Sequence, residues 1–163
     1  MPKPEIRKDY FKEVFVIIAP NRKNRPQELV HKDDDLDKGP EKCYFCPETF
    51  ANDIITYRDN DKNGDWEIIS SVNKYPVVSL SNQSSYGQAE VIVETNQHQK
   101  NLSDFSIDYI VRILDAYINR YRVLKNINGV KHVIIFKNEG GKAGASIKHS
   151  HSQIIALPIL PPK

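Results

Sequence analysis

Two histidines and a glutamine alternate near the C-terminal end of the chain, at positions 149, 151 and 153. The surrounding residues predict a strand over 149–157. Side chains alternate along a strand, so His149, His151 and Gln153 are expected on one face, with successive members roughly 6.6 Å apart. A neutral imidazole can attack phosphorus and form a covalent phosphoramidate, which divides one displacement into two easier steps. The row therefore favours nucleophilic phosphoryl or nucleotidyl transfer.

A glycine-rich segment, residues 138–146, directly precedes this row and has three glycines within five residues. Backbone N–H groups approach an anion closely where no Cβ obstructs them. The segment is not a P-loop, because no Gly-Lys-Ser/Thr follows at the required spacing. Alone it is typical of a simple turn, but beside the histidines it predicts amide donors for phosphoryl oxygens.

Cys43 and Cys46 are the only cysteines, and two residues separate them. Such a pair supplies half of a tetrahedral zinc site, so we expect Zn²⁺ as a cofactor. The redox alternative requires a thioredoxin-like βαβ setting, which the surrounding sequence does not show. Two further ligands must come from the five histidines: His31, His98, His132, His149 and His151. Spacing leaves open a site that uses both His149 and His151, which would consume the nucleophile.

The remaining pattern predicts an α+β domain with a mostly antiparallel sheet and one long helix. Further strands are expected over 14–19, 66–70, 90–94 and 131–136. Residues 59–67 superficially resemble a calcium loop, but Ser70 stands where an EF-hand needs glutamate. A hairpin turn centred on Asn63-Gly64 is favoured instead.

The helix is predicted to begin at Ser103 and to end at Asn128-Gly129, with Asp104 suited to its positive N-terminal end. Apolar residues recur at three- and four-residue intervals along it and are expected to pack into the core. They are Ile110, Ile113, Leu114, Tyr117, Ile118, Tyr121 and Leu124.

Composition and charge indicate which classes of binding partner are disfavoured. Lys and Arg total 23 against 21 for Asp and Glu, so the formal net charge is only +2 and a nucleic-acid partner is disfavoured. Neither a signal-peptide core nor a membrane-length apolar run is present, which predicts a cytoplasmic protein without a membrane partner. Residues 21–42 are expected to form a loop, with the acidic run 33–35 a solvated face.

The segment from Phe136 to Gln153 resembles the active-site region of galactose-1-phosphate uridylyltransferases, a branch of the histidine-triad superfamily. The similarity extends through Asn21–Pro26, the cysteine pair, Val72–Pro76 and Glu90–His98. Several motifs in the right order make this a specific match over most of the chain. The resemblance implies a histidine-triad-like domain over 1–163, corresponding to the N-terminal half of the family's two-domain chain.

The resemblance also implies roles. His151 would accept the uridylyl group from UDP-glucose as glucose 1-phosphate leaves, and galactose 1-phosphate would then take that group. Gln153 would hydrogen-bond the transferred phosphoryl group; related hydrolases carry a third histidine there, so glutamine favours a transferase. The family's zinc ligands match Cys43, Cys46, His98 and His149. Its nucleotide- and phosphate-binding positions match Arg22, Arg25, Asn73, Asn138, Gly144 and Ser146.

Two departures matter. Family members commonly have proline between the two histidines and often before them, where this chain has Ser150 and Lys148. The family's second half, which contributes to sugar-phosphate binding and to the dimer, has no counterpart here, although a homodimer remains possible. Two alternatives to uridylyl transfer stay open: a relative that uses ADP-glucose and inorganic phosphate, and a non-catalytic zinc-containing nucleotide-binding module.

Overall fold

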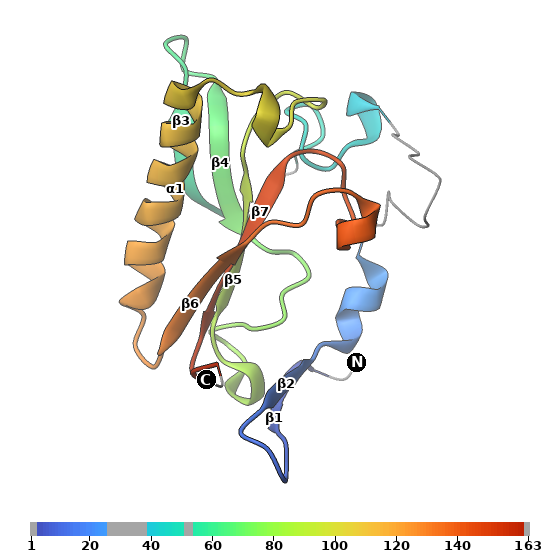
Figure 1. Ribbon diagram of the computed structural model, residues 1–163, viewed down its shortest axis with the longest axis vertical. Helices are drawn as coiled ribbons and strands as arrows, with labels where there is room; N and C mark the ends of the chain where they lie inside the picture. The colour runs from blue at the N-terminus through green and yellow to red at the C-terminus, as the bar shows by residue number, and fades with distance from the viewer. Residues whose placement is uncertain (1–2, 26–38, 51–53, 162–163) are drawn as a thin grey trace.

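The computed structural model describes residues 3–25, 39–50 and 54–161, and its centre is a five-stranded antiparallel sheet (Figure 1). The order across the sheet is β3-β4-β5-β7-β6. Its strands are β3 (Ile55–Asn60), β4 (Trp66–Val72), β5 (Gln88–Val93), β6 (His132–Phe136) and β7 (His151–Leu157). With one long helix beside it, this sheet confirms the predicted α+β class.

Shorter elements surround the sheet. Strands β1 (Glu5–Lys8) and β2 (Phe15–Ile18) pair as a separate antiparallel hairpin. The 3-10 helices are η1 (Pro20–Asn24), η2 (Pro40–Lys42), η3 (Gln83–Ser85), η4 (Leu102–Asp104) and η5 (Gly141–Ala143). Strands β1 and β3 were not predicted. His31 and the acidic run 33–35 lie outside the described residues.

The predicted hairpin turn joins β3 to β4. The Asp61 carboxylate accepts hydrogen bonds from the backbone N–H groups of Asn63 (2.8 Å) and Asp65 (2.9 Å). Gly64 has a φ of 93°, a conformation that glycine adopts without strain. The turn interpretation is therefore confirmed.

Strand β7 lies between β5 and β6, with Val93 opposite His151 and Phe136 opposite Gln153. The strand begins at His151 and not at the predicted residue 149. His149 lies before the first paired residue, and its carbonyl accepts a 2.8 Å hydrogen bond from Nδ1 of His151. The single row of three side chains is therefore corrected: only His151 and Gln153 belong to the strand.

Helix α1 (Ile107–Lys125) runs along one face of the sheet (Figure 1). Its N-cap is Ser106, whose hydroxyl accepts from the N–H of Tyr109, and not the predicted Ser103. Residues 102–104 form the separate turn η4 because the Asp104 carboxylate accepts from the N–H of Asn101 (2.9 Å). The helix also ends at Lys125, before the predicted Asn128-Gly129.

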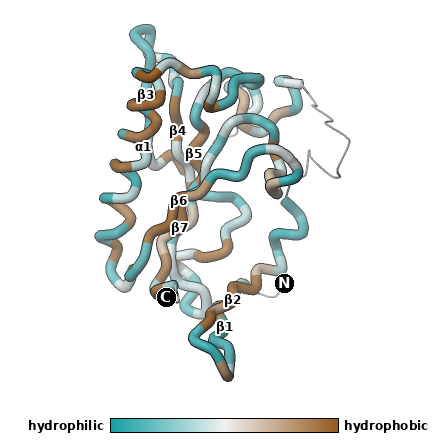
Figure 2. Tube along the Cα trace, in the orientation of Figure 1, coloured by the Kyte–Doolittle hydropathy of each residue, from teal (hydrophilic) through white to brown (hydrophobic). Residues whose placement is uncertain are grey.

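Only part of the helix's apolar stripe is buried. Ile113 and Leu124 join the core with Ile68, Ile92 and Ile154. Leu114, Ile118 and Tyr121 are 48%, 46% and 42% exposed, so their predicted core role is wrong. Each follows a sheet-facing residue by one position, which turns it about 100° around the helix axis. Figure 2 shows hydrophobic residues along β6 and β7 and also on parts of α1.

A buried ion pair fastens the helix to the sheet. Arg120 of α1 donates to both carboxylate oxygens of Glu90 on β5, each at 2.9 Å. Ser70 and Thr56 donate to the same carboxylate, and Arg120 also reaches the carbonyl of Thr56. The pair is almost fully buried, so neither charge tolerates the loss of its partner. None of the helices in the described ranges is long and apolar enough to cross a membrane.

We expect Arg120→Met to lower the free energy of unfolding by about 3–5 kcal/mol, because it leaves the Glu90 carboxylate buried without its cation. Urea denaturation followed by circular dichroism measures the change. Arg122→Met is the matched control, because Arg122 is exposed on the same helix. Equal midpoints for the two variants would show that the pair does not stabilise the fold.

Candidate active site and metal centre

Four side chains from three separate segments converge into one cluster: Cys43, Cys46, His98 and His149. Their candidate ligand atoms lie within 4.8 Å of one another. Cys43 Sγ and Cys46 Sγ each lie 3.5 Å from His149 Nδ1, and Cys46 Sγ lies 3.3 Å from His98 Nδ1. A tetrahedral zinc bound at about 2.3 Å by sulfur and 2.1 Å by nitrogen places neighbouring ligands about 3.6 Å apart. The cluster fits a metal ion of that size.

The backbone around the two cysteines turns both thiols to one side. The N–H of Cys46 donates to the carbonyl of Cys43, and the N–H groups of Thr49 and Phe50 donate to the carbonyl of Cys46. Both thiols are buried and neither forms a disulfide.

His149 is oriented and neutral. Its Nε2 lies 2.7 Å from the carbonyl oxygen of Thr95, which can only accept, so Nε2 carries the proton. The lone pair of Nδ1 therefore faces the thiols, the arrangement in which a second hydrogen bond orients a metal-binding imidazole. Burial, the main cause, lowers the pKa of His149 to about 4, so the ring is uncharged at neutral pH.

The cluster contains His98 in place of His151, so the rival site that would consume His151 is not formed. His98 is partly buried, whereas sequence alone would have given an exposed loop residue. His132 lies on β6 and takes no part in the cluster.

His151 faces a different space. Its Nδ1 donates to the carbonyl of His149 at 2.8 Å, so the ring in its neutral form keeps a lone pair on Nε2. Burial, the largest influence, lowers the pKa of His151; the hydrogen bond to His149 opposes this shift, and the positive charge of Lys137 adds to it. The ring of Phe45 packs against it, with centroids 5.0 Å apart. The result is a neutral, oriented imidazole.

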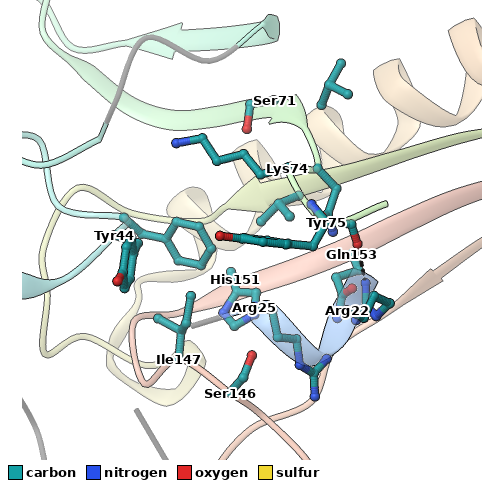
Figure 3. Close-up of a pocket in the computed structure, with 14 residues that line it drawn as sticks. Arg22, Arg25, Tyr44, Ser71, Lys74, Tyr75, Ser146, Ile147, His151 and Gln153 are labelled. Carbon is teal, nitrogen blue, oxygen red and sulfur yellow. Dashed lines mark hydrogen bonds between the residues drawn. The ribbon is translucent and has the colours of Figure 1, made fainter. Parts of the chain in front are cut away.

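A pocket opens beside His151, with about 700 Å³ of empty space, part of it open to solvent. Six predicted site residues line it: Arg22, Arg25, Asn73, Ser146, His151 and Gln153. Figure 3 shows their side chains, with the two arginines at the short helix η1 and His151 and Gln153 on β7. Its lining combines aromatic rings with convergent polar and charged groups, a composition typical of a small-ligand site.

The two arginines make the pocket wall cationic. Arg22 donates to the carbonyl of Tyr75 at 2.8 Å, which anchors η1 to the segment after β4. Burial, together with the charge of Arg25, lowers the pKa of Arg22, yet a guanidinium stays charged in a protein. Planar guanidinium groups match phosphate oxygens in pairs.

Two predicted phosphate-binding residues, Asn138 and Gly144, are not among the described residues that line the pocket. They lie next to each other: a Cβ on Gly144 would stand 3.9 Å from Nδ2 of Asn138. Gly144 has a φ of 82°, which favours glycine. The N–H groups of Ala143 and Ala145 donate to the carbonyl of Gly140, so these two amides are not free for an anion.

Sequence reasoning assigned no role to Tyr44, Phe45, Lys74 and Tyr75, which also line the pocket. Two of them stand between the metal-cluster cysteines and two directly follow Asn73. Their places within those two motifs were the available signal. Aromatic side chains alone do not distinguish a pocket wall from a core, and a single lysine is ordinarily a surface residue.

The amino-acid sequence matches one family model and several named relatives. Residues 26–160 match the family described as "Domain of unknown function (DUF4931) N-terminal domain". The chain is 33% identical to ADP-glucose phosphorylase of Arabidopsis thaliana, over 98% of this chain and 50% of that protein. It is 29% identical to galactose-1-phosphate uridylyltransferase of Thermotoga maritima, over 60% of this chain and 35% of the relative. The chain therefore spans half or less of these relatives' length.

Solved structures agree with the resemblance read from the motifs. The structure of A. thaliana ADP-glucose phosphorylase with bound ADP-glucose matches with a TM-score of 0.68 and 31% identity, over 98% of this chain and 50% of that one. A uridylyltransferase mutant matches with a TM-score of 0.71 and 28% identity, over 97% and 46%. A histidine-triad family protein of Bacillus subtilis shares the fold, with a TM-score of 0.54 and 18% identity. The histidine-triad-like fold predicted from sequence is confirmed.

We expect His98→Ala to weaken metal binding by more than the roughly 10- to 100-fold that the loss of an outer-shell partner costs, because it removes a direct ligand. Elemental analysis of the purified protein, followed by competition with a chelator, measures this. His132→Ala is the control, since this partly buried histidine lies outside the cluster. If both variants keep the same metal content, His98 is not a ligand.

Proposed function

The chain belongs to the DUF4931 N-terminal domain family, within the galactose-1-phosphate uridylyltransferase branch of the histidine-triad superfamily, and from this premise we propose that it forms a covalent nucleotidyl-His151 intermediate. The single observation that carries the proposal is the His151 ring. It is neutral, it holds its proton on Nδ1, and it lines a pocket that contains two arginines.

In the proposed first step, Nε2 of His151 attacks the α-phosphorus of a nucleoside diphosphate glucose. A P–N bond forms as the P–O bond to the sugar phosphate breaks, and glucose 1-phosphate leaves with the bond's electron pair. In the second step, a phosphate oxygen of the acceptor attacks the same phosphorus and the P–N bond breaks, which returns His151 to its neutral form. The two half-reactions replace one difficult displacement.

The other pocket residues bind charge. All four line the pocket, and we propose that Arg22 and Arg25 neutralise the donor's phosphates while the Ser146 hydroxyl and the Gln153 amide hydrogen-bond the transferred phosphoryl oxygens. Asn138 and Gly144 are proposed to shape the phosphate-binding loop. Asn73 accepts from the N–H of Tyr75 and so holds the segment that carries Tyr75 into the pocket.

We assign the cysteine–histidine cluster to zinc, with Cys43, Cys46, His98 and His149 as its four ligands. Two thiolates and two imidazoles complete a tetrahedron, the closed coordination of structural zinc. Bound there, the ion supplies rigidity: it ties the Cys43–Cys46 turn, which carries Phe45, to the start of β7.

UDP-glucose is the first candidate donor, with a hexose 1-phosphate as acceptor, because the active-site segment resembles the uridylyltransferases. ADP-glucose with inorganic phosphate is the second. The observation that favours it is the higher identity over a greater share of this chain to ADP-glucose phosphorylase, 33% over 98% against 29% over 60%. A non-catalytic nucleotide-binding module would retain the pocket and take up no label. A cytoplasmic location and a homodimer remain predictions.

Incubation with UDP-glucose or ADP-glucose labelled at the α-phosphorus is expected to leave acid-labile, base-stable label on the protein. The donor that labels identifies the base. His151→Asn should abolish labelling and keep zinc near one per chain, because His151 lies outside the metal cluster. His132→Asn is expected to label like the unaltered protein. Absence of label with both donors would contradict the transferase proposal.

Arg25→Met is expected to weaken donor binding by about 10- to 150-fold, since a hydrogen bond to a charged group contributes about 1.5–3 kcal/mol. Isothermal titration with the labelling donor measures the Kd. The control is Lys23→Met, which removes an exposed charge two residues earlier, in helix η1, without altering the pocket wall. Equal weakening in both variants would reduce the role of Arg25 to general electrostatic attraction.

A further inference from the structure

A fully buried carboxylate lies behind the proposed nucleophile. Glu94 directly follows β5 and is 0% exposed. One of its oxygens accepts from the hydroxyls of Tyr117 and Ser152, the latter at 2.5 Å. The other accepts from the Ser150 hydroxyl and from Nζ of Lys137, both at 2.7 Å. Four donors therefore occupy the four acceptor positions of the carboxylate.

These donors bracket His151. Ser150 and Ser152 are its immediate neighbours in the chain, and Glu94 holds both of their hydroxyls. Lys137 also donates to the Ser150 hydroxyl at 2.9 Å and lies 3.4 Å from the carbonyl of His151. The N–H of Glu94 donates to the carbonyl of Ser150 at 3.1 Å. Because side chains alternate along a strand, the two serines point toward Glu94 and the α1 residue Tyr117, while His151 points into the pocket.

The Glu94 carboxylate carries a negative charge. Burial, the largest influence, raises the pKa of Glu94, but the charge of Lys137 and the hydrogen bonds from Lys137, Ser152 and Tyr117 outweigh it and leave the pKa below its usual value. Glu94 is thus ionised, and its hydrogen bonds to the serines are charge-assisted, which makes them roughly twice as strong as neutral ones.

We infer that Glu94 and Lys137 are positioning residues, which hold the backbone on both sides of His151 and so keep its Nε2 aimed into the pocket. The inference rests on the proposed function, because it gives these residues a role in the His151 reaction. A misplacement of about 1 Å in a reacting group can cost 100-fold in rate, so small motions of this backbone matter.

The chain contains its own control for this inference. Glu90, four residues earlier, is an equally buried carboxylate held by Arg120, Ser70 and Thr56. It fastens the helix to the sheet but holds neither neighbour of His151. Loss of either carboxylate charge should therefore cost stability, whereas only Glu94 should affect the reaction.

The test compares Glu94→Gln with Glu90→Gln at a temperature where circular dichroism shows both folded. With the labelling donor at saturation, Glu94→Gln is expected to slow single-turnover labelling by about 10- to 100-fold. Its donor Kd should stay within about threefold, because neither Glu94 nor Lys137 lines the pocket. Glu90→Gln should keep the labelling rate per folded molecule. If Glu94→Gln does not fold, Ser150→Ala and Ser152→Ala replace it. Each removes one hydrogen bond to Glu94 and should slow labelling while leaving the Glu94–Lys137 pair intact.

A second measurement needs no substrate. Amide hydrogen exchange in residues 148–153 should be at least tenfold faster in Glu94→Gln than in Glu90→Gln, whose loss of stability affects the whole fold. If the unaltered protein takes up no label, the proposed function fails, while this comparison still decides whether Glu94 holds the segment. Unchanged exchange, unchanged labelling, equal slowing in Glu90→Gln, or a donor Kd weakened more than tenfold would each overturn the inference.

Discussion

The antiparallel pairing of β7 with β5 is the constraint on which the rest of the site depends. It sets Val93 opposite His151 and the end of β5 beside the segment that enters β7. With this register, His149, which precedes β7, lies beside the thiols of Cys43 and Cys46. Thr95, which follows the end of β5, accepts the hydrogen bond that orients the His149 ring. A shift of one residue would turn His151 away from the pocket and toward Glu94, since side chains alternate.

The two faces of β7 bury different polar groups. On the pocket side, His151 is buried without charge, and a single carbonyl decides which of its nitrogens keeps the lone pair. On the helix side, two serines are buried, and a carboxylate with matched donors satisfies them. A buried hydroxyl without a partner would cost free energy, so these serines and Glu94 depend on one another. Ser150, which departs from the family's common proline, thus provides a hydroxyl that a proline does not have.

The metal cluster and the pocket share a wall. Phe45 stands between the cysteines and contacts the rings of both His149 and His151. The turn that brings the two thiols together therefore also places an aromatic face against the proposed nucleophile. Ordering of this turn by a metal would orient the nucleophile's surroundings without any contact between metal and substrate.

Local rules predicted much of the fold. Periodicity indicated the helix and most strands of the sheet, and turn chemistry located the β3–β4 hairpin correctly. The misses have local causes as well. The cap at Ser106 competes with the earlier capping residues around η4. Exposure of Leu114, Ile118 and Tyr121 depends on which side of the helix meets the sheet, and an apolar stripe wider than one face does not specify that.

The sequence by itself determined the residue types: a Cys-x-x-Cys pair, two alternating histidines and a glutamine, together with the motifs that identify the family. Residue spacing left open how they are divided, the family resemblance implied one division, and the tertiary structure brings those residues together. His98 lies 51 residues before His149, yet it completes the metal cluster and leaves His151 in the pocket. The roles of Glu94, Lys137 and Phe45 also come from contacts between segments far apart in the chain. Spacing along a sequence limits only near neighbours, whereas a site assembled across a sheet depends on strand order and register.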